Sequence, residues 1–203
     1  TFLYLQKAIY MILRSPLVVV IFSICLVLKG TVYAQSETNN SIKMTSTLIQ
    51  PTYLQAGDTV AIVAPSGVLK NREGEVQQAV ALLKSWGLYV VVGKHVFKQS
   101  NHFAGTDDER CEDIQNALDD PTISAIWCAR GGYGTVRILD KLDYTKFKNH
   151  PKWVIGYSDI TALHNQLHNN GFKSIHAIMC VSLTKDLSEI ADTVETFKAA
   201  LFG

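Results

Sequence analysis

The hydrophobic pattern of this chain changes period repeatedly from about residue 48 to its last residues. Short apolar runs rich in β-forming residues indicate strands, whereas apolar positions that recur every three or four residues indicate amphipathic helices. Strands are predicted over residues 59–64, 89–92, 125–128, 153–155 and 174–176. Helices are predicted over residues 73–86, 107–118, from about 135, from 160 to a glycine C-cap at 171, and over 187–201.

Strands and helices that alternate in this way are typical of a parallel sheet. The strand segments are apolar throughout instead of alternating with polar residues, which is the pattern of strands covered on both faces. The predicted fold class is therefore α/β, with a parallel β-sheet flanked by helices on both faces. Thr106 is expected to cap the helix at 107–118, with Asp107, Asp108 and Glu109 serving its positive end.

The first 34 residues have the pattern of an export signal. Lys7 and Arg14 precede an apolar run over residues 17–28, and small residues close the segment before Ala34, where we expect cleavage. A membrane anchor is the alternative, but this run is well short of the roughly 20 residues that span a bilayer. We therefore expect an exported, periplasmic protein with no stable membrane span.

Residues 35–47 are polar and aperiodic, as expected of a disordered tether. A signal that starts at Met11 would have an ordinary length. Residues 1–10 could then be upstream sequence that was translated in error. The folded domain is expected over residues 48–185, followed by the helix within 186–203. Removal of the signal takes away three basic residues and no acidic one, so the formal charge falls from +1 to −2. A slightly acidic protein of this kind gives no reason to expect a nucleic-acid partner.

Three cysteines, Cys111, Cys128 and Cys180, remain beyond the signal. An odd number in an exported protein argues against a disulfide framework. Cys128 lies in an apolar strand-like run, where a small buried hydrophobic residue is expected.

Three loops rich in glycine or serine follow the first, third and fourth predicted strands. Because the carboxyl ends of parallel strands meet at one edge of a sheet, we expect these loops to lie together and to form the ligand site. The loops are Pro65-Ser66-Gly67, Ala129-Arg130-Gly131-Gly132-Tyr133-Gly134 and Gly156-Tyr157-Ser158-Asp159.

Ser158 stands at an abrupt change from strand to helix, where free N–H groups and the helix dipole favour an oxyanion. The segment resembles the hydrolase nucleophile elbow G-x-S-x-G at Gly156 and Ser158, but Ile160 replaces the second glycine. Serine is also a common helix N-cap, so the elbow alone leaves both a nucleophile and a simple cap open.

Arg130 precedes the glycines of the second loop, which could turn backbone N–H groups toward an anion. The spacing is neither a Walker A loop nor a dinucleotide fingerprint. A tight turn without a ligand is the alternative. Since a guanidinium binds a carboxylate through two hydrogen bonds, the favoured partner is a substrate with a free carboxyl end.

No residue is an evident general base for Ser158. The carboxylate of Asp159 is adjacent in sequence, but its backbone N–H is better placed to hold an oxyanion. His164 and His168 would share a helix face as two metal ligands do, yet both follow core leucines and lack the H-E-x-x-H pattern, so we do not predict a metal site. His176 closes the predicted strand at 174–176 and could approach the same edge of the sheet.

Together these motifs resemble the LD-carboxypeptidase family of serine peptidases, which also contains the microcin C self-immunity peptidases. The resemblance runs from about residue 48 to about residue 179. The matching residues are 51–54, Gly57-Asp58, 60–67, Arg130 to Gly134 with Arg137, and Gly156 to Thr161 with Leu163-His164.

The resemblance implies a flavodoxin-like or class I amidotransferase-like N-terminal domain, with Ser158 as the nucleophile. It implies the N–H groups of Asp159 and Gly132 as an oxyanion hole, and no metal or other cofactor. The implied reaction releases a terminal D-amino acid, typically D-alanine, from an L-D bond of a murein tetrapeptide. It also suggests homodimers of the full-length protein.

Members of the family continue into a second domain that supplies a Glu and a His to complete a Ser-Glu-His triad, and neither role can be assigned to a residue here. The chain is therefore interpreted as an N-terminal fragment, inactive alone. Two alternatives stay open. One is a non-catalytic domain that binds a peptide carboxylate through Arg130, and the other is a hydrolase of peptidyl nucleotides of the microcin C type.

Overall fold

The computed structural model describes residues 47–183 and 186–203. The predicted export signal, the start at Met11 and the tether up to residue 46 lie outside the described residues. Among the described residues, no helix is both long and apolar enough to cross a membrane.

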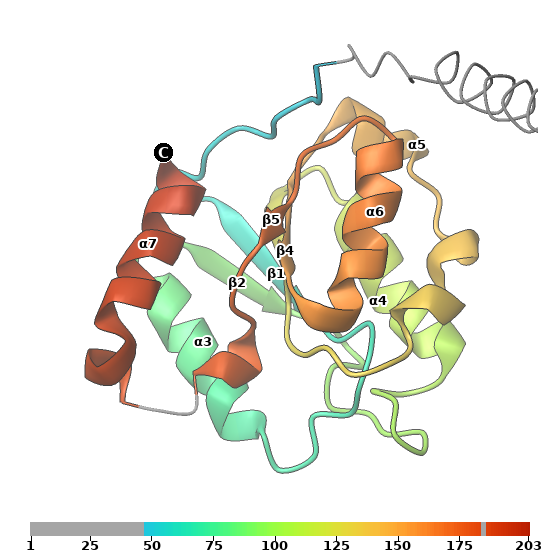
Figure 1. Ribbon diagram of the computed structural model, residues 1–203, viewed down its shortest axis with the longest axis horizontal. Helices are drawn as coiled ribbons and strands as arrows, with labels where there is room; N and C mark the ends of the chain where they lie inside the picture. Colours follow the sequence, from blue (N-terminus) through green and yellow to red (C-terminus); the bar gives the residue numbers. More distant parts are fainter. Residues whose placement is uncertain (1–46, 184–185) are drawn as a thin grey trace, which may run out of the picture. The chain divides into compact units, whose positions relative to one another are not determined.

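Five parallel strands form one sheet in the order β2-β1-β3-β4-β5 (Figure 1). The strands are β1 (Thr59–Val63), β2 (Tyr89–Val92), β3 (Ile123–Cys128), β4 (Trp153–Gly156) and β5 (Ile175–His176). The order is that of flavodoxin-like sheets, in which the chain reverses direction across the sheet between β1 and β3. The predicted α/β class is confirmed.

Helices cover both faces of the sheet (Figure 1). They are α3 (Glu73–Ser85), α4 (Asp107–Asp119), α5 (Thr145–Asn149), α6 (Thr161–Asn169) and α7 (Ala191–Phe202). Alternate residues of β1 point to opposite faces, so Val60 and Ile62 join the core beneath α3 and α7. Ala61 and Val63 join the core beneath α4, α5 and α6. Strands that are apolar throughout thus serve two hydrophobic cores at once.

Two expectations are wrong, one about the coverage of a strand and one about a helix. Coverage on both faces fails at the edge strand β2, where Tyr89 is 68% and Val91 51% exposed. The helix expected from about Thr135 is replaced by two 3-10 turns, Thr135–Arg137 and Leu139–Lys141. Thr and Val favour helices weakly, and side chains outside the segment hold its two ends, Asp159 at Thr135 and Gln115 at Asp143, so tertiary contacts decide its shape.

The predicted helix ends are confirmed at α4 and α6. Thr106 and Glu109 form a complete capping box at the start of α4. Gly171 adopts a φ of +89° just beyond α6 and donates its N–H to His168 O. Asp107 and Asp108 lie in the first turn of the same helix, as expected, and they also pair with Arg110 and Arg137 and with Lys141.

The three described cysteines carry free thiols. Cys128 and Cys180 are fully buried. Burial raises the pKa of the Cys128 thiol to about 12, so this side chain stays protonated and packs as a small hydrophobic residue, as expected.

Lys152 is buried, and its ammonium donates to the carbonyls of Ala117 and Asp120 at the end of α4. Burial lowers the pKa of Lys152 from 10.5 to about 8. Between these values the unfolded chain holds a proton that the folded chain does not, so raising the pH favours folding. We expect the free energy of unfolding to rise by on the order of 3 kcal/mol from pH 8 to pH 10.5 relative to Lys152→Met. Urea unfolding of both proteins across this range measures the difference, and a constant difference would contradict the assignment.

Candidate active site

The three loops singled out in the sequence meet at the carboxyl edge of the sheet. Strands β1, β3 and β4 are direct neighbours in parallel register, so the segments that follow them emerge side by side. Hydrogen bonds connect the first loop to each of the other two, from Gly67 N–H to Gly131 O and from Ser66 Oγ to Asp159 Oδ2. In parallel sheets, the crevice outside the strand ends at the point where the strand order reverses is a common ligand site.

Ser158 occupies a strained turn between β4 and α6. It opens a 3-10 helix, Ser158–Ile160, with a φ of +61°, a left-handed value that costs a non-glycine residue about 1 kcal/mol or more. The residue is exposed. Neither this short helix nor α6 receives a hydrogen bond from a capping side chain, so Ser158 does not act as an N-cap. Its hydroxyl is presented to solvent at a helix start, which is the geometry of a nucleophile elbow.

Ile160, which departs from the elbow motif, is accommodated by Gly156. The Ile160 side chain is fully buried. A Cβ added at Gly156 would lie 2.9 Å from Ile160 Cγ2, so the first glycine of the motif makes the space that the isoleucine fills. The departure therefore leaves the sharp turn intact.

The glycine loop passes directly beside Ser158. A Cβ added at Gly131 would lie 3.3 Å from Ser158 Oγ, and one added at Gly67 would lie 2.8 Å from Gly131 O. The approach at Gly67 excludes a side chain, and a side chain at Gly131 would push Ser158 away by a few tenths of an ångström. Gly132, the expected second oxyanion donor, has a φ of +115° and follows Gly131 in the same loop.

The carboxylate of Asp159 holds the three loops together. Its Oδ2 accepts hydrogen bonds from the Ser66 hydroxyl and, at 2.9 Å, from the Thr135 N–H. Ser66 and Thr135 are fully buried, and their hydroxyl oxygens lie 2.6 Å apart. This carboxylate oxygen is therefore engaged by the neighbouring loops and is not free to act as a base for Ser158.

Arg110, which was not predicted as a site residue, extends from α4 and contacts two of the same loops. Its side chain is 1% exposed and donates to Pro65 O of the first loop and to Gly134 O of the second. It also pairs with Asp107, and the hydrogen bond from Arg137 holds the pKa of that carboxyl below its usual range. One signal was present in the sequence. Arg110 shares the apolar stripe of α4, which predicts a buried and paired cation.

Arg130, which is expected to bind a substrate carboxylate, directly precedes Gly131 in the glycine loop. Its guanidinium donates to Val68 O and lies against Gly67. The side chain is only partly buried. Arg130 thus contacts the first loop through one nitrogen, and the rest of its guanidinium fork can still bind an anion.

The histidines do not supply a base within the described residues. His164 uses both ring nitrogens, toward Gly156 O at 3.0 Å and Ser174 Oγ at 2.8 Å, and burial lowers its pKa. His176 is exposed beside the end of β4 and packs against the rings of Tyr157 and His164, without a described hydrogen bond to Ser158. No group of three or more His, Cys, Asp or Glu side chains in the described ranges could hold a metal ion.

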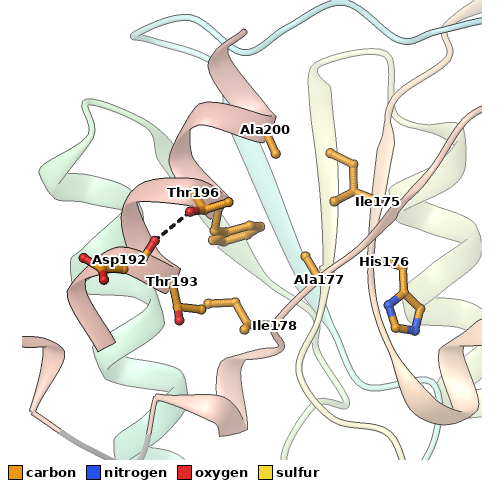
Figure 2. Close-up of a pocket in the computed structure, with 9 residues that line it drawn as sticks. Ile175, His176, Ala177, Ile178, Asp192, Thr193, Thr196 and Ala200 are labelled. Carbon is orange, nitrogen blue, oxygen red and sulfur yellow. Dashed lines mark hydrogen bonds between the residues drawn. The ribbon is translucent and has the colours of Figure 1, made fainter. Parts of the chain in front are cut away.

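A groove of about 420 Å³ lies between α7 and the segment that follows β5. Figure 2 shows Ile175, Ala177 and Ile178 facing the residues of α7 across it. Ser158 is not among the residues that line this groove. The groove therefore does not contain the candidate nucleophile, which is exposed at the carboxyl edge of the sheet.

Comparison with known proteins agrees with these observations. The probable murein peptide carboxypeptidase of Bacillus subtilis is 38% identical over 131 residues, which cover 64% of this chain and 40% of that protein. The murein tetrapeptide carboxypeptidase of Pseudomonas aeruginosa is 34% identical over 125 residues, or 61% of this chain and 40% of that protein. The chain spans about half the length of the curated relatives it matches.

A solved structure shares the fold. The microcin C7 self-immunity protein in complex with aspartyl sulfamoyl adenosine superposes with a TM-score of 0.71 at 25% identity, covering 76% of this chain and 47% of that one. A family model described as the LD-carboxypeptidase N-terminal domain matches residues 60–177. These residues include the three loops and the strained turn at Ser158, and the chain belongs to the LD-carboxypeptidase family.

Proposed function

We propose that this chain is the nucleophile-bearing part of a serine carboxypeptidase that releases a terminal D-amino acid, D-alanine, from murein tetrapeptides at an L-D bond. The observation that carries the proposal is the strained, exposed Ser158 at the carboxyl edge of the sheet, with the glycine loop beside its hydroxyl. The names of the relatives from B. subtilis and P. aeruginosa support murein peptides as the substrate.

In the proposed reaction, Ser158 Oγ attacks the carbonyl carbon of the L-D bond while a general base takes the hydroxyl proton, which it later gives to the leaving amine. The N–H groups of Asp159 and Gly132 donate to the oxyanion that forms on the carbonyl oxygen, which is where such donors lower the barrier most. The C–N bond then breaks, the amine of D-alanine takes a proton and leaves, and water hydrolyses the acyl-enzyme to free Ser158. Arg130 binds the terminal carboxylate of the substrate.

We propose that the base comes from residues outside this chain. Oδ2 of Asp159 and both nitrogens of His164 are engaged in hydrogen bonds, and none of the described hydrogen bonds joins a histidine or a carboxylate to the Ser158 hydroxyl. The curated relatives are about twice as long as the matched region. A second domain that supplies a Glu and a His would complete a triad with Ser158 and cover the substrate at this edge of the sheet.

We also propose that the protein is exported, with cleavage after Ala34, and meets murein peptides in the periplasm. The basic residues and apolar run of the first 34 residues support this location. The N-terminal sequence of the mature protein, read after expression in a Gram-negative host, tests the cleavage site.

The substrate is tested with the full-length protein of the gene that encodes this chain. A murein tetrapeptide ending in D-alanine should release D-alanine, whereas the matched peptide ending in L-alanine should not. Residues 48–203 alone should release neither, because the base is missing. Equal release from the two peptides would contradict an L-D carboxypeptidase.

A second candidate is hydrolysis of a peptidyl nucleotide by the same serine. It is favoured by the structural similarity to the microcin C7 self-immunity protein, which was solved with aspartyl sulfamoyl adenosine. An aspartyl or glutamyl adenylate analogue with a cleavable bond is therefore the third substrate of the panel. Hydrolysis of this compound without release of D-alanine would select the second candidate.

A further inference from the structure

The two proposed oxyanion donors lie on different loops, and one dipeptide of a third loop contacts both. Asp159 follows Ser158, and Gly132 belongs to the glycine loop. Ser66, on the loop after β1, donates its hydroxyl to Asp159, and its neighbour Gly67 donates its N–H to Gly131 O at 3.0 Å. One dipeptide, Ser66-Gly67, thus contacts both donor loops.

The bond from Gly67 to Gly131 orients the Gly132 N–H. A peptide unit is planar and trans, so the C=O of Gly131 and the N–H of Gly132 point in opposite directions. Since Gly131 O points at Gly67, the Gly132 N–H is turned away from the first loop. Gly131 itself lies against Ser158. The first loop therefore determines which way the expected donor points.

The hydrogen bond from Ser66 to the Asp159 side chain orients the other proposed donor, the backbone N–H of Asp159. A left-handed φ at a non-glycine residue persists only where neighbouring contacts hold it. The Asp159 side chain, whose Oδ2 is held by Ser66 and by the Thr135 N–H, fixes the peptide that joins it to Ser158. The same contact thereby holds both the φ of +61° at Ser158 and the direction of the Asp159 N–H.

We propose that Ser66 and Asp159 are positioning residues whose hydrogen bond, together with the bond from Gly67 to Gly131, aligns the two N–H donors of the oxyanion hole with Ser158. This inference rests on the proposed function of Ser158 as a nucleophile. Neither side chain touches the reacting atoms. Their contribution is to keep two loops, separated by 93 residues at this contact, in one fixed geometry before the substrate arrives.

The test compares Ser66→Ala and Asp159→Ala with the wild-type full-length protein. The first readout is the rate at which a fluorophosphonate labels Ser158, a reaction that forms an Oγ–P bond and expels fluoride whatever the natural substrate is. The second is kcat and KM for D-alanine release. We expect both variants to lower the labelling rate and kcat by about 10- to 100-fold, with KM changed less than threefold, because a misaligned donor weakens transition-state stabilisation.

Two further variants separate alignment from folding. Asp159→Asn keeps an oxygen that can accept from Ser66 and Thr135, so it should recover most of the labelling rate. Asp113→Ala is the matched control, because Asp113 is a buried carboxylate that also accepts two hydrogen bonds, both from His95. It should lower the melting temperature as Asp159→Ala does, yet label at the wild-type rate.

The outcomes distinguish the inference from the function on which it rests. Wild-type labelling rates in Ser66→Ala and Asp159→Ala would overturn the inference, as would an equal loss in Asp113→Ala. A wild-type protein that labels at Ser158 but releases no D-alanine would refute the proposed substrate, while its labelling rates would still test the positioning role. A wild-type protein that does not label at Ser158 would overturn both.

Discussion

Ser158→Ala should abolish the release of D-alanine by the full-length protein. Loss of an activated serine costs on the order of 10⁶ in rate in serine hydrolases, so no partial effect is expected. The folded state should be almost unaffected, because the Ser158 side chain is exposed and caps neither adjoining helix. The measurement is kcat for a murein tetrapeptide, with the thermal melting curve recorded on the same sample.

Ser85→Ala is the matched control for this variant. Ser85 is the last residue of α3, and its hydroxyl donates to Leu82 O in the same helix. Removal of this hydroxyl should therefore leave kcat at the wild-type value. Residual activity of Ser158→Ala within tenfold of wild type would mean that another group attacks the substrate. The family assignment would stand in that case, and the role of Ser158 would not.

Arg110→Met should cause the second large effect, on stability. Arg110 is 1% exposed, and its removal leaves the buried carbonyls of Pro65 and Gly134 without their donor, while Asp107 keeps its bond to Arg137. A buried acceptor left without its donor costs about 1–3 kcal/mol. Urea unfolding should show a loss of this size. The activity of the remaining folded protein should also fall, because Arg110 holds the first and second loops.

Arg137→Met tests whether the effect comes from burial. Arg137 also pairs with Asp107, but its side chain is 45% exposed. An exposed ion pair contributes about 1 kcal/mol or less, so this variant should unfold close to the wild-type urea concentration. Equal losses in the two variants, or a loss below about 1 kcal/mol in Arg110→Met, would contradict the bracing role assigned to Arg110.

Much of the fold could be predicted because it depends on local periodicity. The strand β1, the helix α4 with its cap Thr106, and the glycine beyond α6 all follow from residues within one element or next to it. The prediction failed where distant contacts override weak local preference, as at Thr135. The strand β2 was predicted, but its expected coverage on both faces failed, because its edge position in the sheet cannot be read from its own apolar residues.

The candidate site, like the fold, could be predicted from the sequence only in part. Ser158 and Arg130 could be singled out as candidates because each lies in a short motif that follows a strand, and parallel strands end at one edge, whereas the pairing of Asp159 and Gly132 as oxyanion donors came from the family resemblance. The role of Asp159 as a link between loops was not predicted, because Ser66 lies 93 residues away in the sequence. Arg110 was missed for a similar reason, since its contact with Pro65 spans 45 residues.

The sequence by itself determined the α/β class, the three loops at one sheet edge and the serine at the turn, because periodicity and motif spacing are local properties. Only the tertiary structure decided that Ser158 adopts a left-handed backbone, that Gly131 lies against its hydroxyl and that Ser66, Asp159 and Arg110 hold the loops in place. Such contacts join residues far apart in the chain, and they exist only once the sheet has brought the strand ends together.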